Sequence, residues 1–316
     1  MLLLYKILNL AGDYIVAFLT VILSVLVLGL TPIFTLVNLF RNKTFNSPKN
    51  IVITGASSGI GYSLALHYSQ PGVTISLFGR NEANLLKCKK ECEAKGAVAE
   101  IKIADVTDRK TMKKYLTDFD NRYPVDLLIA NAGIIESQLP NDFDFEEKTH
   151  KLTETNVIGM LNTVLPLLSK FEERKGGQIC ITSSLAGYMD FFFPAYSASK
   201  SYITSYAFTL RKRMAEFGVG VSVIVPGFIT TPMTDSFKRQ DLLFCLNVDQ
   251  AIKIIANGIK YNMAQISFPF PTFLLGILFS ISPPNFRGAL SYLVSFAIKD
   301  IYFFDHVEKK EDKKNN

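Results

Sequence analysis

Asn50–Gly61 reads NIVITGASSGIG, a short β-branched run that leads directly into a turn with three glycines. Glycine lets the backbone turn tightly and approach a bound pyrophosphate, and the next residues, YSLAL, continue as an apolar helix. The N-terminus of such a helix presents free N–H groups and the positive end of its dipole to an anion. This order predicts the first unit of a dinucleotide-binding sheet. The expected cofactor contacts are Gly55, Ser57, Ser58, Gly59, Ile60 and Gly61.

Short apolar runs rich in β-branched residues recur after this unit. They are VTISLF at 73–78, AEIKIAD at 99–105, VDLLIAN at 125–131, QICITS at 178–183 and VSVIV at 221–225. Apolar strands separated by helix-length segments favour βα units and a parallel sheet covered by helices on both faces. We therefore predict a Rossmann-type doubly wound parallel α/β sheet that forms one domain over residues 48–263.

The amino-terminal flank has a different composition. Residues 14–40 contain no charged side chain, and a helix of that length at about 1.5 Å per residue exceeds the roughly 30 Å of a bilayer core. A cleaved signal peptide has a shorter apolar stretch, of about 7 to 15 residues. We predict a retained transmembrane helix and linker over 1–47. Arg41 and Lys43 follow it, which favours a cytosolic main domain.

The carboxyl-terminal flank, 264–316, is apolar up to about residue 304 but interrupted by prolines and by Arg287 and Lys299. Its uninterrupted apolar runs are short for a span, so we favour an interfacial membrane-associated segment over two spanning helices. The last residues, Lys313–Asn316, resemble the dilysine retrieval signal of endoplasmic-reticulum membrane proteins. The alternative is a solvated charged tail. We expect an endoplasmic-reticulum membrane protein.

The end of the second predicted strand bears on the choice of cofactor. A Rossmann unit that prefers NAD carries a carboxylate there for the ribose 2′-hydroxyl, whereas this chain reads Leu77-Phe78-Gly79-Arg80-Asn81. A guanidinium suits a 2′-phosphate, so Arg80 predicts NADP(H). The alternative is a surface arginine that only solvates the loop. Asp105 and Val106 end the third strand, where they are expected to contact the adenine, or Asp105 to cap a helix.

Tyr196 and Lys200 are four residues apart in a segment that continues as a long amphipathic helix. Residues with this spacing share one helix face, so the ammonium group is expected beneath the phenol. A phenol with a pKa near 10 is a poor acid or base at neutral pH, and a nearby cation stabilises the phenolate. The pair therefore predicts a tyrosine whose pKa is lowered toward the working pH.

These motifs together resemble the short-chain dehydrogenase/reductase family over roughly residues 50–235. The matching segments, in chain order, are Thr54–Gly61, Asn131–Gly133, Asn156, Ser183–Gly187, Tyr196 with Lys200, and Pro226-Gly227 with Thr231. The resemblance implies hydride transfer between a nicotinamide and a carbonyl or alcohol carbon. Anchored members similar to this chain include 3-ketodihydrosphingosine reductases and steroid and retinol dehydrogenases. Assembly as a homodimer through the long helices is an expectation from the family only.

The resemblance also implies a role for each matching residue. Tyr196 gives its proton to the developing alkoxide or takes one from the alcohol, Lys200 holds the nicotinamide ribose, and Ser184 hydrogen-bonds the substrate oxygen. Ser183 is the lesser candidate for that serine. Asn156 positions a water that links Lys200 to solvent. The remaining cofactor contacts are expected from Asn131, Ala132, Gly133, Pro226, Gly227, Ile229 and Thr231.

Composition and single residues exclude other classes. Thirty-four Lys and Arg against 28 Asp and Glu leave a net charge of +6, which suits an anionic lipid surface or a phosphorylated cofactor and is no signature of nucleic-acid binding. Cys88 and Cys92 have no second ligand pair at metal-binding spacing, so no metal site is expected. His67, His150 and His306 have no serine or cysteine motif beside them, which leaves Ser-His hydrolysis unsupported.

Apolar residues near the expected site indicate the substrate. Phe191–Phe193 lie between Ser184 and Tyr196, and Met233, Phe237, Leu242, Leu243 and Phe244 follow Thr231. These side chains either line a pocket or fill core and subunit contacts. Together with the anchor they favour an NADP-dependent oxidoreductase that acts on a steroid, retinoid, ketosphingoid or fatty carbonyl. The alternatives are a small-carbonyl reductase localised by its anchor and a nucleotide-binding scaffold without turnover.

Overall fold

The computed structural model describes residues 44–189, 193–234, 244–283 and 286–289, together with 11–12, 14–15, 18–19, 21–26, 29–30 and 33. The chain divides into two compact units. One is 44–273, which carries the sheet, and the other combines 1–43 with 274–316. The first unit continues past residue 263, where we expected the catalytic domain to end.

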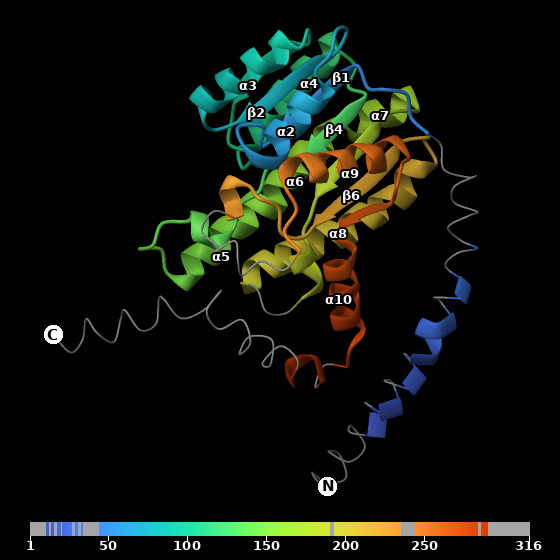
Figure 1. The fold of residues 1–316 in the computed structure, drawn as a ribbon. Helices are drawn as coiled ribbons and strands as arrows, with labels where there is room; N and C mark the ends of the chain where they lie inside the picture. The colour runs from blue at the N-terminus through green and yellow to red at the C-terminus, as the bar shows by residue number, and fades with distance from the viewer. Residues whose placement is uncertain are drawn as a thin grey trace, which may run out of the picture. The chain divides into compact units, whose positions relative to one another are not determined.

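The first unit is built on a seven-stranded parallel sheet of strand order β3-β2-β1-β4-β5-β6-β7 (Figure 1). The predicted Rossmann-type sheet is thereby confirmed. Its strands are β1 Asn50–Thr54, β2 Thr74–Gly79, β3 Val98–Ile103, β4 Leu127–Ala130, β5 Gln178–Thr182, β6 Gly220–Pro226 and β7 Gln265–Phe268. The order reverses between β1 and β4, and ligands of open α/β sheets bind at the carboxyl edge beside such a reversal.

The helices that connect the strands cover both faces of the sheet (Figure 1). Their bounds are α2 Gly59–Tyr68, α3 Glu82–Ala94, α4 Arg109–Arg122, α5 Phe145–Thr153, α6 Gly159–Val164, α7 Leu168–Arg174, α8 Pro194–Ala215 and α9 Val248–Lys260. Short helical turns supplement them: η1 Glu136–Gln138, η2 Glu154–Ile158, η3 Leu165–Leu167, η4 Leu185–Tyr188 and η5 Pro232–Thr234.

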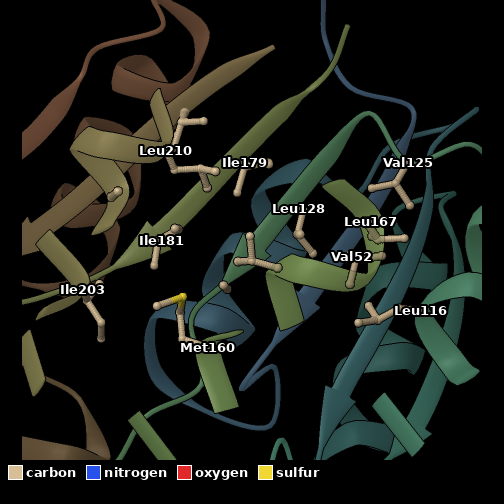
Figure 2. Close-up of a cluster of buried hydrophobic side chains, with 14 of the residues drawn as sticks. Val52, Leu116, Val125, Leu128, Met160, Leu167, Ile179, Ile181, Ile203 and Leu210 are labelled. Atoms are coloured by element: carbon tan, nitrogen blue, oxygen red, sulfur yellow. The ribbon is translucent and has the colours of Figure 1, made fainter. Parts of the chain in front are cut away.

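Alternate residues of each strand enter opposite cores. In β4, for example, Leu128 lies in the core beneath α4, α6 and α8, whereas Leu127 and Ile129 lie in the core beneath α2, α3 and α9. Figure 2 shows the first of these cores, in which Val52, Leu128 and Ile179 of the sheet meet Leu116, Met160 and Leu210 of the helices. Both faces of β1, β4, β5 and β6 are buried, which explains why their sequences are almost continuously apolar.

Strand β7 was missed by the sequence analysis. It pairs in parallel with β6, from Val223 opposite Gln265 to Pro226 opposite Phe268. Its sequence, QISF, is short and half polar, so it lacks the continuous apolar run that marked the other strands. The apolar segment that we assigned to a membrane from residue 264 therefore begins with the edge strand of the sheet.

The predicted anchor at 14–40 falls largely on residues outside this description. Within the described part of the chain, no helix has both the length and the hydropathy needed to cross a bilayer. The structure thus supplies no spanning helix in support of the anchor, which stays a prediction. The tail Lys313–Asn316 lies outside the described residues as well. The described part of the carboxyl-terminal flank contains α10, Phe270–Ile281, an apolar helix without a charged residue.

Candidate active site

The glycine turn between β1 and α2 is closed by contacts that exclude side chains. Gly55 has a φ of +69° and Gly59 a φ of +56°, which is the left-handed region that glycine adopts without strain. A Cβ on Gly61 would collide with the carbonyl oxygen of Gly55, and one on Gly55 would lie 3.0 Å from Ala132 Cα. The turn therefore leaves the N-terminus of α2 open to a ligand, as a dinucleotide phosphate requires.

Thr54 and Thr182 were not singled out from the sequence, yet they fix the strand ends around this turn. Thr54 Oγ1 accepts the backbone N–H groups of Asn131 at 3.0 Å and of Ala132 at 3.2 Å. Thr182 Oγ1 donates to Asn131 Oδ1 at 3.2 Å, and Asn131 Nδ2 donates to the Thr54 carbonyl at 3.2 Å. Asn131 thus joins β1, β4 and β5. The signal in the sequence that could have indicated this role is a threonine at the carboxyl end of β1 and another at the carboxyl end of β5, the two strands on either side of β4.

Arg80 and Asp105 end β2 and β3 at the same edge of the sheet. Arg80 Nη1 lies 3.8 Å from Asp105 Oδ2, and the Arg80 side chain is 62% exposed. Burial raises the pKa of Asp105, but hydrogen bonds from Thr107 and the charge of Arg80 outweigh it and leave the net pKa below its usual range. Arg80 therefore faces a carboxylate at this edge of the sheet. Val106 is buried against Gly159 of α6.

Tyr196, Lys200 and Ser184 come together where β5 meets the start of α8. The Ser184 side chain acts on the Tyr196 hydroxyl, whose pKa it lowers, and Lys200 Nζ lies 5.5 Å from the centre of the Tyr196 ring. Lys200 Nζ also donates to the carbonyl oxygen of Thr182 at 3.3 Å. Pro194 stands in the first turn of α8, where its missing N–H breaks no helical hydrogen bond, so the helix begins just ahead of the tyrosine.

Burial controls the protonation of the pair. Tyr196 is 8% exposed and Lys200 5%. Burial raises the pKa of Tyr196, against a smaller lowering effect of the hydrogen bond with Ser184, and burial lowers the pKa of Lys200 to about 8. The expected lowering of the Tyr196 pKa is therefore not found, because desolvation of the phenolate outweighs the neighbouring groups.

Asn156 lies in η2, a single π-helical turn between α5 and α6. Such turns are rare and frequent at functional sites. Asn156 Oδ1 accepts the N–H of Ile134 at 2.8 Å, and its Nδ2 donates to the carbonyl of Ile134 at 3.0 Å. A Cβ on Gly133 would lie 3.2 Å from Asn156 Oδ1 and 3.4 Å from Lys200 Nζ. Gly133 thus brings the asparagine and the lysine side by side.

Ser183 has a structural role in this arrangement. Its Oγ lies 2.8 Å from the carbonyl of Lys200 and 2.8 Å from Thr204 Oγ1, and the residue is 2% exposed. Gly187 packs on the same helix, since a Cβ there would lie 2.9 Å from the backbone of Lys200 and Ser201. These contacts dock the serine segment onto α8 and leave Ser184 to face Tyr196.

The loop after β6 approaches the glycine turn from the other side. A Cβ on Gly59 would lie 3.6 Å from Cβ and Cγ2 of Thr231. Gly227 packs against Leu185 and Pro269, and Ile229 is 3% exposed in the core beneath α9. Pro226 is buried at the end of β6. The residues expected to contact a cofactor thus stand on both sides of the carboxyl edge of the sheet.

A small apolar cluster surrounds Tyr196. Its buried members are Ile134, Ile135, Leu152, Ala186 and Tyr196, and the partly buried side chains packed on it are Leu139, Phe193, Ala195 and Met233. Phe193 and Met233 were among the residues expected to line a pocket. Phe244 is 57% exposed. Phe191, Phe192, Phe237, Leu242 and Leu243 lie outside the described residues.

This arrangement defines a class of protein. A glycine turn at a helix N-terminus beside a strand-order reversal fits a dinucleotide. The buried Tyr196 phenol and Lys200 amine and the partly buried Ser184 hydroxyl stand at the same edge of the sheet. That is the site of a nicotinamide-dependent oxidoreductase. The family model for short chain dehydrogenases matches residues 49–242, and the chain belongs to this family.

Individual relatives agree with this assignment. An uncharacterized oxidoreductase of Myxococcus xanthus is 31% identical over 226 residues, which covers 71% of this chain and 88% of the relative. The 3-dehydrosphinganine reductase TSC10B of Arabidopsis thaliana is 29% identical, with 72% of each chain covered. The short-chain dehydrogenase from Sphingobium yanoikuyae in complex with NADPH has the same fold, with a TM-score of 0.63, 19% identity, and 83% of this chain and 99% of that chain covered.

Proposed function

We propose that this protein is an NADP-dependent oxidoreductase that transfers a hydride between NADPH and the carbonyl group of a lipophilic substrate. The observation that carries the proposal is the buried Tyr196, with Lys200 Nζ 5.5 Å from its ring centre and Ser184 acting on its hydroxyl, at the sheet edge that holds the glycine turn. A bound nicotinamide supplies the hydride. The chain supplies the proton and the groups that hold the carbonyl oxygen.

Each side chain has a defined task in reduction. The Tyr196 hydroxyl donates its proton to the carbonyl oxygen as the carbon accepts the hydride, and its raised pKa keeps that proton in place until then. The Ser184 hydroxyl donates a hydrogen bond to the same oxygen, where negative charge develops. Lys200 holds a positive charge below the tyrosine and stabilises the phenolate that remains. Asn156 keeps the loop at Ile134 and Gly133 closed around that lysine.

The preference for NADPH rests on Arg80. With Arg80→Ala we expect the dissociation constant of NADPH to rise about tenfold, since a hydrogen bond to a charged group contributes about 1.5 kcal/mol or more. The constant for NADH is expected to change less than about twofold because NADH has no phosphate at this position. Cofactor fluorescence titrations measure both constants.

Arg122 provides a matched control for this measurement. It is also a surface arginine paired with a carboxylate, Glu100, at 2.6 Å, but it lies on α4. Arg122→Ala is expected to leave both constants unchanged. Equal weakening of NADPH and NADH by Arg80→Ala contradicts the assigned role and leaves Arg80 as a solvated surface residue.

The lipophilic substrate is supported by the cluster around Tyr196, whose side chains are apolar throughout. Helix α10 supports delivery from a membrane. Phe270, Leu274, Leu275, Leu278 and Ile281 are exposed on it, and residues 264–286 contain no charged side chain. An uncharged, exposed apolar helix suits the boundary between lipid headgroups and acyl chains. We place the protein at the endoplasmic-reticulum membrane with its sheet in the cytosol, on the strength of the dilysine-like tail and the positive flank of the predicted anchor.

Purified full-length protein in phosphatidylcholine vesicles tests the substrate class. We expect NADPH consumption with a long-chain ketosphingoid base or a steroid ketone at a kcat/KM about a hundredfold above that for diacetyl, because each buried methylene contributes about 0.8 kcal/mol. The protein is also expected to float with these vesicles. Equal or faster turnover of diacetyl favours a small-carbonyl reductase instead, and cofactor binding without any turnover favours a scaffold.

A further inference from the structure

The hydroxyl of Thr234 connects three backbone groups of the loop after β6. Its Oγ1 donates to the carbonyl of Ile229 at 2.6 Å, with the carbonyl of Thr231 also within 2.9 Å, and accepts the N–H of Thr231 at 3.0 Å. The N–H of Thr234 donates to the same Thr231 carbonyl at 2.9 Å. One side chain thus closes the turn Ile229–Thr234, and this role does not follow from its place in the sequence.

The base of this turn is held independently. Ile229 and Leu246 form an isolated parallel bridge, in which Thr230 N–H donates to Leu246 O and Leu246 N–H donates to Phe228 O, both at 3.0 Å. The bridge fixes where the turn leaves the sheet. It does not fix the direction of the residues beyond Thr230, so that direction depends on Thr234.

Two side chains of the turn reach the candidate active site. Thr231 faces the glycine turn, at 3.6 Å from a Cβ placed on Gly59. Met233 packs on the apolar cluster that contains Tyr196. The turn therefore touches the cofactor side of the site through one residue and the substrate side through another. Thr234 itself touches neither side.

We propose that Thr234 is a positioning residue, whose hydroxyl holds Thr231 against the glycine turn and Met233 against the tyrosine cluster. The proposal rests on the function proposed above, because it assumes that a nicotinamide cofactor contacts both Thr231 and the glycine turn. Loss of the hydroxyl leaves the bridge at Ile229 intact but frees the turn. Cofactor and substrate are then held less tightly, while the proton-transfer groups on α8 and η4 stay in place.

The test compares Thr234→Val, which keeps the shape and removes the hydroxyl, with Thr234→Ser, which keeps the hydroxyl. For Thr234→Val we expect the dissociation constant of NADPH, measured by cofactor fluorescence without substrate, to rise about tenfold, the loss expected when a partly buried hydrogen-bonding hydroxyl is removed. For Thr234→Ser the change is expected to stay within about twofold. Hydrogen exchange of the peptide containing the Thr231 amide is expected to be faster in Thr234→Val only.

Thr117→Val is the matched control, because that hydroxyl also bonds backbone carbonyls, at Lys113 and Lys114, but lies on the surface of α4. Unchanged NADPH affinity in Thr234→Val, or equal weakening in Thr234→Ser, overturns the assignment of Thr234. Failure of the unmodified protein to bind any nicotinamide cofactor overturns the proposed function instead. The Thr234 variants thus test the role of Thr234, and the unmodified protein tests the proposed function.

Discussion

Tyr196→Phe is expected to lower kcat for ketone reduction by about 10²–10⁴-fold, the usual contribution of a positioned general acid, while NADPH binds as before. The variant removes one oxygen and keeps the ring against Ile134, Ile135 and Ala186, so the apolar packing of the cluster is preserved. The oxygen is the atom on which Ser184 acts, and it is the only part of the side chain that can donate a proton. Absorbance of NADPH with a saturating ketone measures the loss.

The control for this experiment is Tyr188→Phe. Tyr188 is also partly buried beside the serine segment, but its hydroxyl donates to Gln265 Oε1 at 2.9 Å, on strand β7. We expect Tyr188→Phe to change the free energy of unfolding but to leave kcat for ketone reduction nearly unchanged. Turnover by Tyr196→Phe at the unmodified rate means that another group delivers the proton, and the mechanism above is then wrong.

Lys200→Met is expected to stabilise the ligand-free protein at neutral pH while lowering kcat by about 10²-fold or more. Burial moves the pKa of Lys200 from 10.5 to about 8, which corresponds to an unfavourable free energy on the order of 3 kcal/mol for keeping the buried cation below pH 8. Methionine has a similar shape and no charge. Part of the gain is offset by loss of the bond from Lys200 Nζ to the Thr182 carbonyl.

The pH dependence identifies the lysine as the source of this effect. Below pH 8 the amine is protonated in both the folded and the unfolded protein, so the advantage of Lys200→Met is constant. Above pH 8 the folded protein loses its proton first, and the penalty in the unmodified protein disappears by about the unfolded pKa of 10.5. Urea titrations at several pH values measure the free energies of unfolding of the unmodified protein and of Lys200→Met. We expect the difference between the two to shrink as the pH rises from 8 to about 10.5. A constant difference up to pH 10.5 contradicts the buried cation.

The sheet could be predicted because its strands carry their own signal. Both faces of β1 and β4–β6 are buried, so their apolar runs stand out, whereas QISF in β7 reads as part of a polar break before α10. Tyr196 and Lys200 could be paired from helical spacing alone. Thr54 and Thr182 were missed because their partners lie on neighbouring strands, and no local pattern encodes that neighbourhood.

Energetic properties of the site were harder to predict than its members. The pKa of Tyr196 was expected to be lowered by the charge of Lys200, yet burial decides its direction. The apolar surface around Tyr196 comes from the loop at Ile134 and Ile135, from α5 and from η4 together. The choice between Ser183 and Ser184 likewise depends on which hydroxyl reaches Thr204 and which reaches Tyr196. Such distances exist only in the folded chain.

The close packing of Gly187 on α8 leaves little room for substitutions beside Tyr196, Lys200 and Ser184, in contrast to the turn that carries Met233. Tyr196, Lys200 and Ser184 belong to one tightly packed block. Even a methyl group on Gly187 would lie 2.9 Å from the backbone of Lys200. Met233, in contrast, belongs to a turn that is closed by the Thr234 hydroxyl and one backbone hydrogen bond, from Thr234 N–H to the Thr231 carbonyl. On the function proposed above, we expect substitutions that broaden or narrow the range of accepted ketones to accumulate in that turn, while the block that carries Tyr196, Lys200 and Ser184 stays unchanged.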